Sequence, residues 1–341
     1  MDRRLLVAFV LTVMVSSVMT RLVRYLSYRF QWVDRPRFRH IHHQAMATMG
    51  GLALHVSFWL VFAILFKEQF AHYTSVFVGS SLIVLTGAID DYRDLSPFQK
   101  TFGILLATVL VVSKSSLLIE TIRMGNTLIF LPVWLQWLAT GVWFFLLTNA
   151  MNLIDGLDGL ASGVTVISLL TMGMIFYWFI FPTPFPQLVI VILMMGSLLG
   201  FLPYNWYPAS IYLGDTGSLW LGFMLSVVSL VGVKSAAFVS VILPVFILAL
   251  PLIDSVFSVI RRLWTGQAIF QGDRKHLHHR LLDVGLSHLQ AVLAILSISL
   301  LFSLSALTAQ VYHDISVIFF ALAIVLATYL IVMTRKKPKD G

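Results

Sequence analysis

The chain of 341 residues contains no cysteine and few charged residues. Without cysteine it can form neither a disulfide nor a thiolate metal site. Charged residues make up 11% of the sequence, whereas a soluble domain carries roughly 25%. Hydrophobic residues make up 59%. This composition is typical of a polytopic membrane protein, and no segment between the apolar runs is large enough to fold as a soluble domain.

A signal-peptide cleavage site is also missing near the start of the chain. Arg3 and Arg4 precede an apolar run that continues to about Val23, and no A-x-A-like site follows it. We therefore expect an uncleaved first membrane span.

Long apolar runs dominate the rest of the sequence. A membrane span needs about 20 apolar residues, and eleven segments meet this rule. They lie at about 5–25, 48–66, 74–90, 101–119, 128–149, 159–181, 187–203, 216–233, 236–258, 288–309 and 314–334. The sequence therefore predicts an all-α, polytopic membrane protein in which residues 1–341 form one integral-membrane domain.

The basic residues predict its orientation. Cytoplasmic loops carry the excess of lysine and arginine, and an N-terminus outside the cell puts 17 of the 23 basic residues on the cytoplasmic side. The predicted cytoplasmic segments are about 26–47, 90–100, 150–158, 204–215 and 259–287, with a tail at 335–341. The odd number of spans then places the C-terminus in the cytoplasm. Because topology accounts for the net charge of +8, we expect no nucleic-acid partner.

This orientation also gathers most aspartates at the cytoplasmic face. They are Asp90, Asp91, Asp94, Asp155, Asp158, Asp215, Asp254, Asp273 and Asp283. Ionisable residues at the edge of lipid usually face a site. Several inner loops and helix ends therefore converge on one polar surface, which is the pattern of an active site.

Two adjacent carboxylates, Asp90 and Asp91, end the third predicted span. Adjacent carboxylates repel each other, so one can keep a raised pKa and act as a base, or both can face cations. The alternative is an ordinary helix end in contact with water. Lys100 can anchor a phosphate or only extend its amine toward the interface.

Four polar residues interrupt the apolar sequence around the sixth predicted span: Asn149, Asn152, Asp155 and Asp158. The spacing of three puts the two carboxylates on one face of a helix. Together the four side chains can bind a hydrated Mg²⁺ or a polar ligand, since hard cations prefer oxygen. A helix N-cap explains one of the carboxylates but not all four groups.

A third motif, Tyr212-Leu-Gly-Asp215-Thr-Gly-Ser218, precedes the eighth predicted span. Asp215 can be a metal ligand, and Gly214 and Gly217 can let phosphate oxygens approach backbone N–H groups. An N-cap is again the alternative. Asn205 adds an amide that can read the edge of a base.

A basic loop carries the fourth motif. Adjacent histidines are poorly placed to share one zinc ion, so phosphate binding is the better fit, with a solvated basic loop as the alternative. The residues are Arg274, Lys275, His276, His278, His279 and Arg280.

In order, these motifs resemble those of the polyprenyl-phosphate N-acetylhexosamine-1-phosphate transferases. The resemblance covers nearly the whole chain. The matching residues are Asp90-Asp91 with Leu95 and Lys100, Asn149-x-x-Asn152-x-x-Asp155-Gly-x-Asp158-Gly-Leu-Ala161, Gly214-Asp215-Thr-Gly-Ser218, Pro251-Leu-Ile-Asp254 with Arg261-Arg262, and His276-x-His278-His279. His42 and Gly50-Gly51 match the amino-terminal pattern of the family, although Ala47 stands where the family usually has proline.

The resemblance implies an enzyme at the cytoplasmic face of the bacterial inner membrane. It would transfer N-acetylglucosamine-1-phosphate from UDP-GlcNAc to undecaprenyl or another polyprenyl phosphate, with Mg²⁺ (or Mn²⁺), and release UMP. This is the first lipid-linked step of cell-envelope glycans such as O-antigen or teichoic acid. The implied partners are a UDP-N-acetylhexosamine, the polyprenyl phosphate, the lipid bilayer and a second copy of the chain, since homodimers are common in the family. The phospho-MurNAc-pentapeptide transferases are a more distant alternative, because Leu277 interrupts their contiguous histidine triplet.

The resemblance also implies roles for individual residues. Asp90, Asp91 and Asp215 are the implied catalytic residues, and Asn152 and Asp215 the implied metal ligands. The implied substrate-binding residues are His42, Lys100, Asn149, Asp155, Asp158, Asn205, Tyr212, Arg274, Lys275, His276, His278, His279 and Arg280. Two routes stay open: direct attack by the lipid phosphate, or an aspartyl-phosphate on Asp215 or Asp90.

Two other classes of membrane protein share part of this pattern. A transporter carries charges near the membrane midplane, often with an internal repeat, whereas these charges lie at one face. An intramembrane aspartyl protease also uses a Gly-Asp motif, but it leaves the Asn/Asp cluster and the histidines unexplained.

Overall fold

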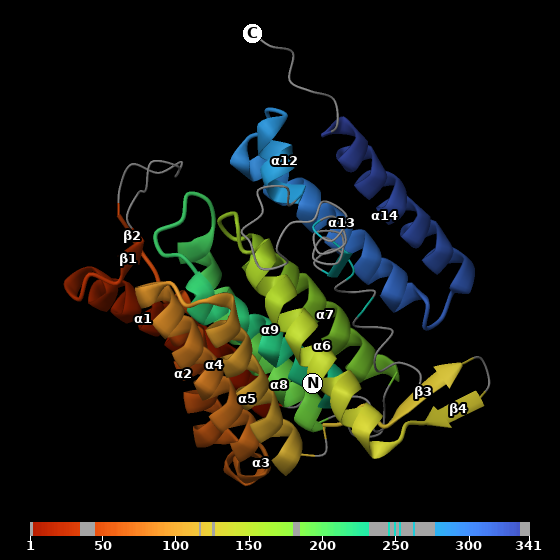
Figure 1. Cartoon of the computed structure of the whole chain (residues 1–341), viewed down its shortest axis with the longest axis horizontal. Coiled ribbons are helices and arrows are strands. Elements are labelled where there is room, and N and C mark those ends of the chain that lie inside the picture. The colour runs from red at the N-terminus through yellow and green to blue at the C-terminus, as the bar shows by residue number, and fades with distance from the viewer. Residues whose placement is uncertain are drawn as a thin grey trace.

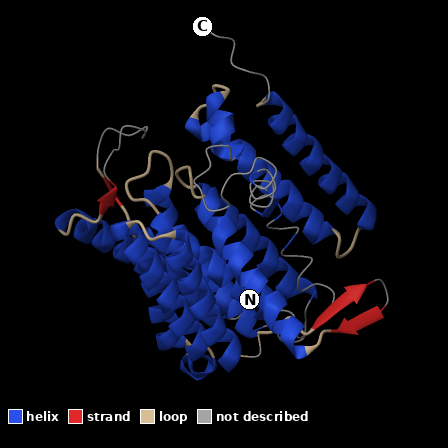
Figure 2. Cartoon of the chain, in the orientation of Figure 1, coloured by secondary structure: helices blue, strands red, loops and turns tan. Residues whose placement is uncertain are grey.

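The computed structural model describes residues 3–34, 45–115, 117–124, 127–179, 185–231 and 277–334, with a few single positions between 245 and 262. This part of the chain is a bundle of long helices with two short strand pairs (Figure 2). The helices are α1 (Arg3–Arg29), α2 (Gly50–Leu65), α3 (Lys67–His72), α4 (Thr74–Arg93), α5 (Pro97–Lys114), α6 (Val133–Ile154), α7 (Leu160–Phe179), α8 (Phe185–Asn205), α9 (Gly214–Val231), α12 (Leu277–Asp283), α13 (His288–Thr308) and α14 (His313–Met333). The antiparallel strand pairs are β1 (Val33–Asp34) with β2 (Met46–Ala47), and β3 (Thr121–Met124) with β4 (Thr127–Phe130).

The helices confirm the all-α, multi-pass class. Each predicted span except 236–258 coincides with a helix, and 236–258 lies largely outside the described residues. Eight of the described helices are long and apolar enough to cross a membrane. The total of eleven spans and the side on which each terminus lies stay predictions.

Several predicted boundaries differ from the structure; the span expected at 101–119, for example, is the helix Pro97–Lys114. The span expected from 128 begins at Val133, because residues 121–124 and 127–130 form the paired strands β3 and β4 and Pro132 precedes the helix. Proline has no N–H to donate, so it suits the start of a helix. The loop expected at 150–158 begins later, since α6 continues to Ile154. Asn149 and Asn152 therefore project from a helix.

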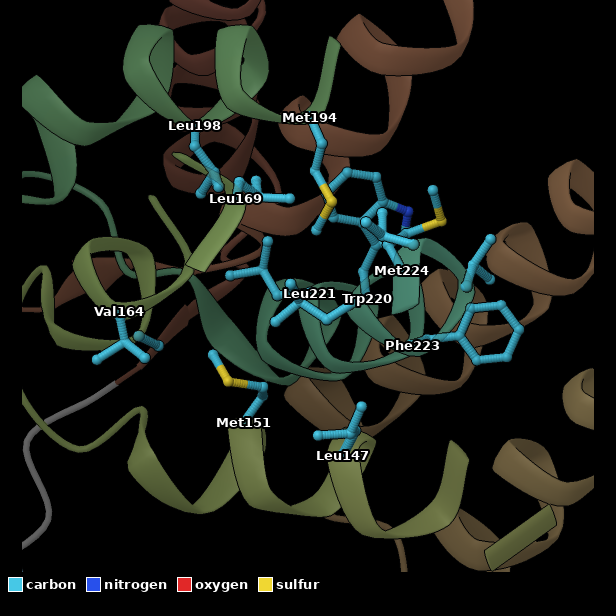
Figure 3. Close-up of a cluster of buried hydrophobic side chains, with 14 of the residues drawn as sticks. Leu147, Met151, Val164, Leu169, Met194, Leu198, Trp220, Leu221, Phe223 and Met224 are labelled. Carbon is cyan, nitrogen blue, oxygen red and sulfur yellow. The ribbon is translucent and has the colours of Figure 1, made fainter. Parts of the chain in front are cut away.

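Helix α9 lies at the centre of the bundle. It packs against α2, α4 and α6. Of its residues 83% are buried within the protein, against 17% of the most apolar stretch of α14. Its side chains Trp220, Leu221 and Phe223 lie in the apolar cluster that Leu147 and Met151 of α6 also line (Figure 3). The position of α9 is therefore fixed from several sides.

Glycines bring the helices around the start of α9 into backbone contact. A methyl group on Gly51 of α2 would overlap the backbone of Gly217, and one on Gly87 of α4 would overlap Thr216. Small residues allow this close approach between helices in a membrane. The same packing leaves Gly217 covered by α2, so its predicted contact with phosphate does not fit the fold.

The two ends of the bundle differ in what they carry. β1, β2 and α12 lie at one end, the upper end in Figure 1, whereas α3 and the β3–β4 hairpin lie at the opposite end. Helices α4 and α6 end, and helices α7 and α9 begin, beside the polar residues that the sequence singled out.

Candidate active site

The first group of site residues comes from the ends of α4, α5, α6 and α9. We call Asp90, Asp91, Lys100, Asn152 and Asp215 the carboxylate wall. Ser96 and Gln99 form a capping box that starts α5, so Lys100 lies in its first turn, facing the last turn of α4.

Lys100 lies between two carboxylates of this wall. Its ammonium forms an ion pair with Asp90 Oδ2 and donates to Asp215 Oδ2 at 2.5 Å. The other carboxylate oxygen of Asp90 accepts the backbone N–H of Leu95 at 2.6 Å. Asp90 and Asp215 therefore share one cation, although they are 125 residues apart in sequence.

Asp91 has a different environment from its neighbour Asp90. Its Oδ1 accepts the backbone N–H of Asp215 at 2.8 Å, and its Oδ2 accepts the backbone N–H and the hydroxyl of Thr216 at 3.1 and 2.5 Å. Gly214 has a φ of 71° and leaves room for this carboxylate. Asp91 thus caps the start of α9 from another helix and satisfies two of its free backbone donors.

The two asparagines of α6 lie one helical turn apart. The side-chain nitrogen of Asn152 donates to Asp215 Oδ1 at 2.6 Å and to Ser218 Oγ at 2.9 Å. The corresponding nitrogen of Asn149 donates to Phe145 O within α6 at 2.7 Å. Asn152 is therefore in the carboxylate wall, whereas the amide nitrogen of Asn149 is bonded to a carbonyl of its own helix.

The second group comes from residues 155–159, 206–213 and the starts of α12 and α13, and we call it the loop wall. The backbone N–H of Asp158 donates to His288 Nε2 at 2.9 Å, while Asp158 Oδ2 accepts the backbone N–H of Ala209 at 3.0 Å. The ring of Tyr207 stacks on His288 with centroids 4.5 Å apart. Asp158 thus joins three segments that are far apart in sequence.

Two titratable groups near this wall stay protonated more readily than usual. Burial, followed by the negative charge of Asp215, raises the pKa of Asp155 well above its usual value. Burial, followed by the charge of Asp158, raises the pKa of Tyr212 to about 12. Tyr212 is therefore a hydrogen-bond donor at neutral pH.

Asn205 is buried and uses both ends of its amide within the protein. Its nitrogen donates to Ile211 O at 3.1 Å, and its oxygen accepts from Ser162 Oγ at 2.9 Å. Tyr212, in the same loop, donates its backbone N–H to Ala47 O at 2.9 Å. The geometry gives Asn205 a part in holding the loop, while its predicted contact with a base stays a prediction.

The described part of the histidine motif lies beside the loop wall. His278 is buried with its ring against Gly156, where a methyl group would overlap Nε2. The ring of His279 lies 4.2 Å from that of His278. Arg280 donates to Ile331 O at 3.2 Å, in the last turn of α14. The structure thus brings His278 to the site and turns Arg280 toward α14.

Four predicted site residues, His42, Arg274, Lys275 and His276, lie outside the described residues. Their roles stay predictions.

Sequence reasoning missed four contributors to the two walls. Thr216 and Ser218 lie within a motif that it quoted, but only as neighbours of Asp215. His288 and Tyr207 were not singled out. The capping box of Ser287 and Gln290, which begins α13, is readable from the sequence and would have placed His288 at a helix start.

The carboxylate wall is built to hold positive charge. Two carboxylates converge on one ammonium, and Asn152 adds an amide to the same place. Within the described ranges, no three His, Asp or Glu side chains come together as a metal cluster.

Comparison with known proteins agrees with this geometry. Residues 73–233 match the model of glycosyl transferase family 4. The chain is 35% identical over 330 residues to a probable undecaprenyl-phosphate N-acetylglucosaminyl 1-phosphate transferase of Bacillus subtilis (strain 168), covering 93% of the chain and 88% of that relative.

Two further relatives have related names. A decaprenyl-phosphate N-acetylglucosaminephosphotransferase of Mycolicibacterium smegmatis is 33% identical over 81% of the chain and 75% of that relative. The undecaprenyl-phosphate alpha-N-acetylglucosaminyl 1-phosphate transferase of Escherichia coli (strain K12) is 29% identical over 88% of the chain and 83% of that relative. With this likeness along nearly its whole length, the chain belongs to glycosyl transferase family 4, among the polyprenyl-phosphate hexosamine-1-phosphate transferases.

Proposed function

We propose that the chain transfers N-acetylglucosamine-1-phosphate from UDP-GlcNAc to a polyprenyl phosphate and releases UMP. The observation that carries this proposal is the meeting of Asp90, Lys100 and Asp215 at one end of a membrane bundle. Transfer between two anionic substrates needs charge neutralisation and positioning more than covalent help. The names of the relatives supply the sugar and the lipid.

We infer that the metal is Mg²⁺, with Mn²⁺ as a substitute. The donors fit, because Asp215 and Asn152 offer oxygens, and Mg²⁺ typically takes one or two protein ligands and completes its shell with water and phosphate. In the structure the side-chain nitrogen of Asn152 faces Asp215, and a flip of the amide group would turn its oxygen to the same place. When bound, the ion neutralises charge on the diphosphate.

The residues of the carboxylate wall then have separate tasks. Asp90 orients the lipid phosphate, which barely needs a base because its second pKa is near 6. Lys100 lies within reach of both carboxylates and supplies positive charge to the phosphates as they enter. An oxygen of the lipid phosphate attacks the β-phosphorus of UDP-GlcNAc, and the bond from that phosphorus to the bridging oxygen breaks, so that UMP leaves with the electron pair.

The contacts of Asp215 favour direct attack over an aspartyl-phosphate. One of its oxygens accepts from Lys100, and the other faces Asn152 and, in our proposal, the metal, so neither is presented as a free nucleophile. Asp91 is likewise engaged by the start of α9. We therefore propose that Asp91 positions Asp215 and does not itself act as a base.

The loop wall is the proposed nucleotide-sugar side of the site. Asp155 in its protonated form and Tyr212 donate hydrogen bonds, and His278 provides an imidazole beside Gly156. Asp158 holds the loop that carries Tyr212. These groups suit a polar, partly anionic ligand that enters from water.

Release of UMP by the purified chain tests the proposal. UDP-GlcNAc, UDP-GalNAc and UDP-MurNAc-pentapeptide are supplied separately with one polyprenyl phosphate and Mg²⁺. We expect UMP and a lipid-linked product from UDP-GlcNAc, both dependent on metal and lipid. Turnover of UDP-MurNAc-pentapeptide alone would move the chain to the other branch, and no UMP from any donor would contradict the transferase assignment.

The proposed cytoplasmic placement of the site has a test of its own. Since the chain has no cysteine, single cysteines report on topology without background. Asp283 and Glu68 are both exposed and lie at opposite ends of the bundle. A membrane-impermeant maleimide added to intact bacterial cells should label Glu68→Cys and spare Asp283→Cys, and the reverse pattern would invert the topology.

A further inference from the structure

The half of α1 that ends near β1 carries two arginines on its outer surface. Arg21 and Arg24 are exposed, and α1 contains no acidic residue along its 27 residues. Among the residues that the structure describes, neither arginine has an acidic partner within ion-pair distance. Within the described part of the chain, this end of α1 is therefore a cationic surface without a counter-ion from the protein.

Arg21 is held in one orientation by Tyr204 of α8. Its Nε donates to the Tyr204 hydroxyl at 2.6 Å, and Ser17 Oγ lies 3.0 Å from the same hydroxyl. The guanidinium carbon is 5.8 Å from the centre of the Tyr204 ring. Because Nε is engaged, the two terminal amino groups stay free for a bidentate bond to a phosphate. A fixed guanidinium loses less entropy on binding than a mobile one.

An apolar strip leads along α1 to this arginine. Val7, Met14 and Val18 are 56%, 62% and 62% exposed, and with Arg21 and Tyr25 they follow a helical spacing that puts them on one face. In a membrane helix, such a strip faces the acyl chains of lipid. The strip and the arginine together match one amphiphile, with its tail along Val7 to Val18 and its phosphate at Arg21.

This surface is separate from the carboxylate wall. Helix α1 packs against α2 and α8, whereas Asp90, Asn152 and Asp215 lie on α4, α6 and α9 (Figure 1). The separation favours a bulk membrane lipid over the acceptor lipid. Tyr204 nevertheless connects the surface to the site, since its carbonyl accepts the backbone N–H of Ser210 in the loop that carries Tyr212.

We propose that Arg21, Arg24 and Tyr204 form a binding site for the phosphate of an anionic phospholipid, whose acyl chain lies along the outer face of α1. Each arginine near a membrane surface strengthens binding of an anionic lipid by about fivefold. Tyr204 contributes by orienting Arg21. The site does not depend on the proposed catalytic activity.

Native mass spectrometry of the full chain in detergent, titrated with phosphatidylglycerol or phosphatidylcholine, tests this site. We expect the protein to bind one phosphatidylglycerol at least tenfold more tightly than phosphatidylcholine. The double variant Arg21→Gln/Arg24→Gln should lose this preference, and Tyr204→Phe, which removes only the hydroxyl, should weaken it about threefold. The matched control is Arg3→Gln/Arg4→Gln, which removes two charges from the other end of the same helix and should keep the preference.

Three outcomes would overturn the proposal. The preference could survive in the Arg21→Gln/Arg24→Gln variant, or it could fall equally in the Arg3→Gln/Arg4→Gln control, which would indicate only general charge attraction. Displacement of the bound phosphatidylglycerol by one equivalent of polyprenyl phosphate would assign the site to the acceptor. Thermal unfolding in detergent shows whether each variant is folded. If the Arg21→Gln/Arg24→Gln variant is not folded, the result for Tyr204→Phe decides the test.

Discussion

The carboxylate wall and the loop wall are built by different means. In the carboxylate wall, side chains from four helices meet each other around the charge of Lys100, although Asp90 and Asp91 also accept backbone N–H groups. In the loop wall, side chains bind backbone groups, as when Asp158 accepts from Ala209 and His288 accepts from Asp158. Helices fix the first wall rigidly, whereas the second depends on how three connections fit together. We therefore expect changes in the carboxylate wall to lower kcat and changes in the loop wall to raise KM for the nucleotide sugar.

Asp215→Asn should cause the largest loss of kcat. A small loss would contradict the expectation that the carboxylate wall determines kcat. The substitution removes a negative charge that faces Lys100 and, in our proposal, the metal. Loss of one preorganised electrostatic group costs on the order of 10³-fold in kcat. UMP release under saturating substrates measures it. Asp94→Asn is the control, because Asp94 lies at the end of α4, away from α9, with a positive φ that asparagine also adopts. Equal activity of the two variants would remove Asp215 from the site.

Asp91→Asn tests whether neighbouring carboxylates in one wall have different tasks. The oxygen of an amide can accept at most two of the three hydrogen bonds that Asp91 now accepts, and the amide carries no charge toward the start of α9. We expect a roughly 10- to 100-fold loss of kcat together with about 1–2 kcal/mol of stability, the scale of a lost helix cap. Activity and thermal unfolding in detergent are measured on the same sample.

The corresponding Asp90→Asn variant sharpens this contrast. Asp90 holds Lys100 and the Leu95 amide, and it does not cap a helix. It should lose more activity than Asp91→Asn and less stability. The opposite order would assign the larger catalytic role to Asp91 and refute its positioning role.

The sequence predicted one wall better than the other for physical reasons. Helices of the carboxylate wall follow from apolar runs, and its polar groups are conspicuous because charge in lipid is rare. The division of labour between Asp90 and Asp91 was not predictable, since it depends on which of them faces the start of α9. In the loop wall, His288 was missed because a histidine at a helix start has no local signature of its distant partner Asp158.

Loop geometry explains the remaining misses. Strand β4 was expected largely as helix, because its apolar residues were counted into a span and the role of Pro132 was not weighed. The contact of Asn205 with a base stays a prediction, but its amide is already used by Ile211 and Ser162, which only the folded loop brings near. Composition identifies polar residues near a membrane, but it does not tell which of them are satisfied internally.

Gly156→Ala should affect the loop wall alone. The added methyl group overlaps Nε2 of His278, so the ring or the loop has to move. Overpacking of this kind costs about 1–3 kcal/mol, and we expect KM for UDP-GlcNAc to rise about tenfold with a smaller change in kcat. Gly141→Ala is a matched control, because a methyl group there meets nothing within 4 Å. A fall in kcat without a change in KM would place His278 with the carboxylate wall.

His288→Phe separates the two contacts that His288 makes. Phenylalanine keeps a ring for Tyr207 to stack on but cannot accept the Asp158 N–H. One lost hydrogen bond costs about 1 kcal/mol, which predicts a three- to fivefold rise in KM for UDP-GlcNAc. His288→Ala loses both contacts and should raise KM further. An unchanged KM in both variants would mean that the contacts of His288 with Asp158 and Tyr207 are not needed to hold the loop in place.

The smallest expected effect is on the pH dependence of stability. It tests whether the charge of Asp215 in the carboxylate wall acts on Asp155 in the loop wall. Burial and the charge of Asp215 raise the pKa of Asp155, so the folded protein binds a proton there that the unfolded chain releases at lower pH. The stability that this proton provides is complete below the unfolded pKa near 3.9 and is lost as pH rises through the higher folded value. Asp155→Asn has no proton to lose, so its thermal midpoint should fall less than that of the native chain as pH rises. Parallel curves for the two proteins would show that Asp155 faces water and not the carboxylate wall, and the two walls would then be electrostatically independent.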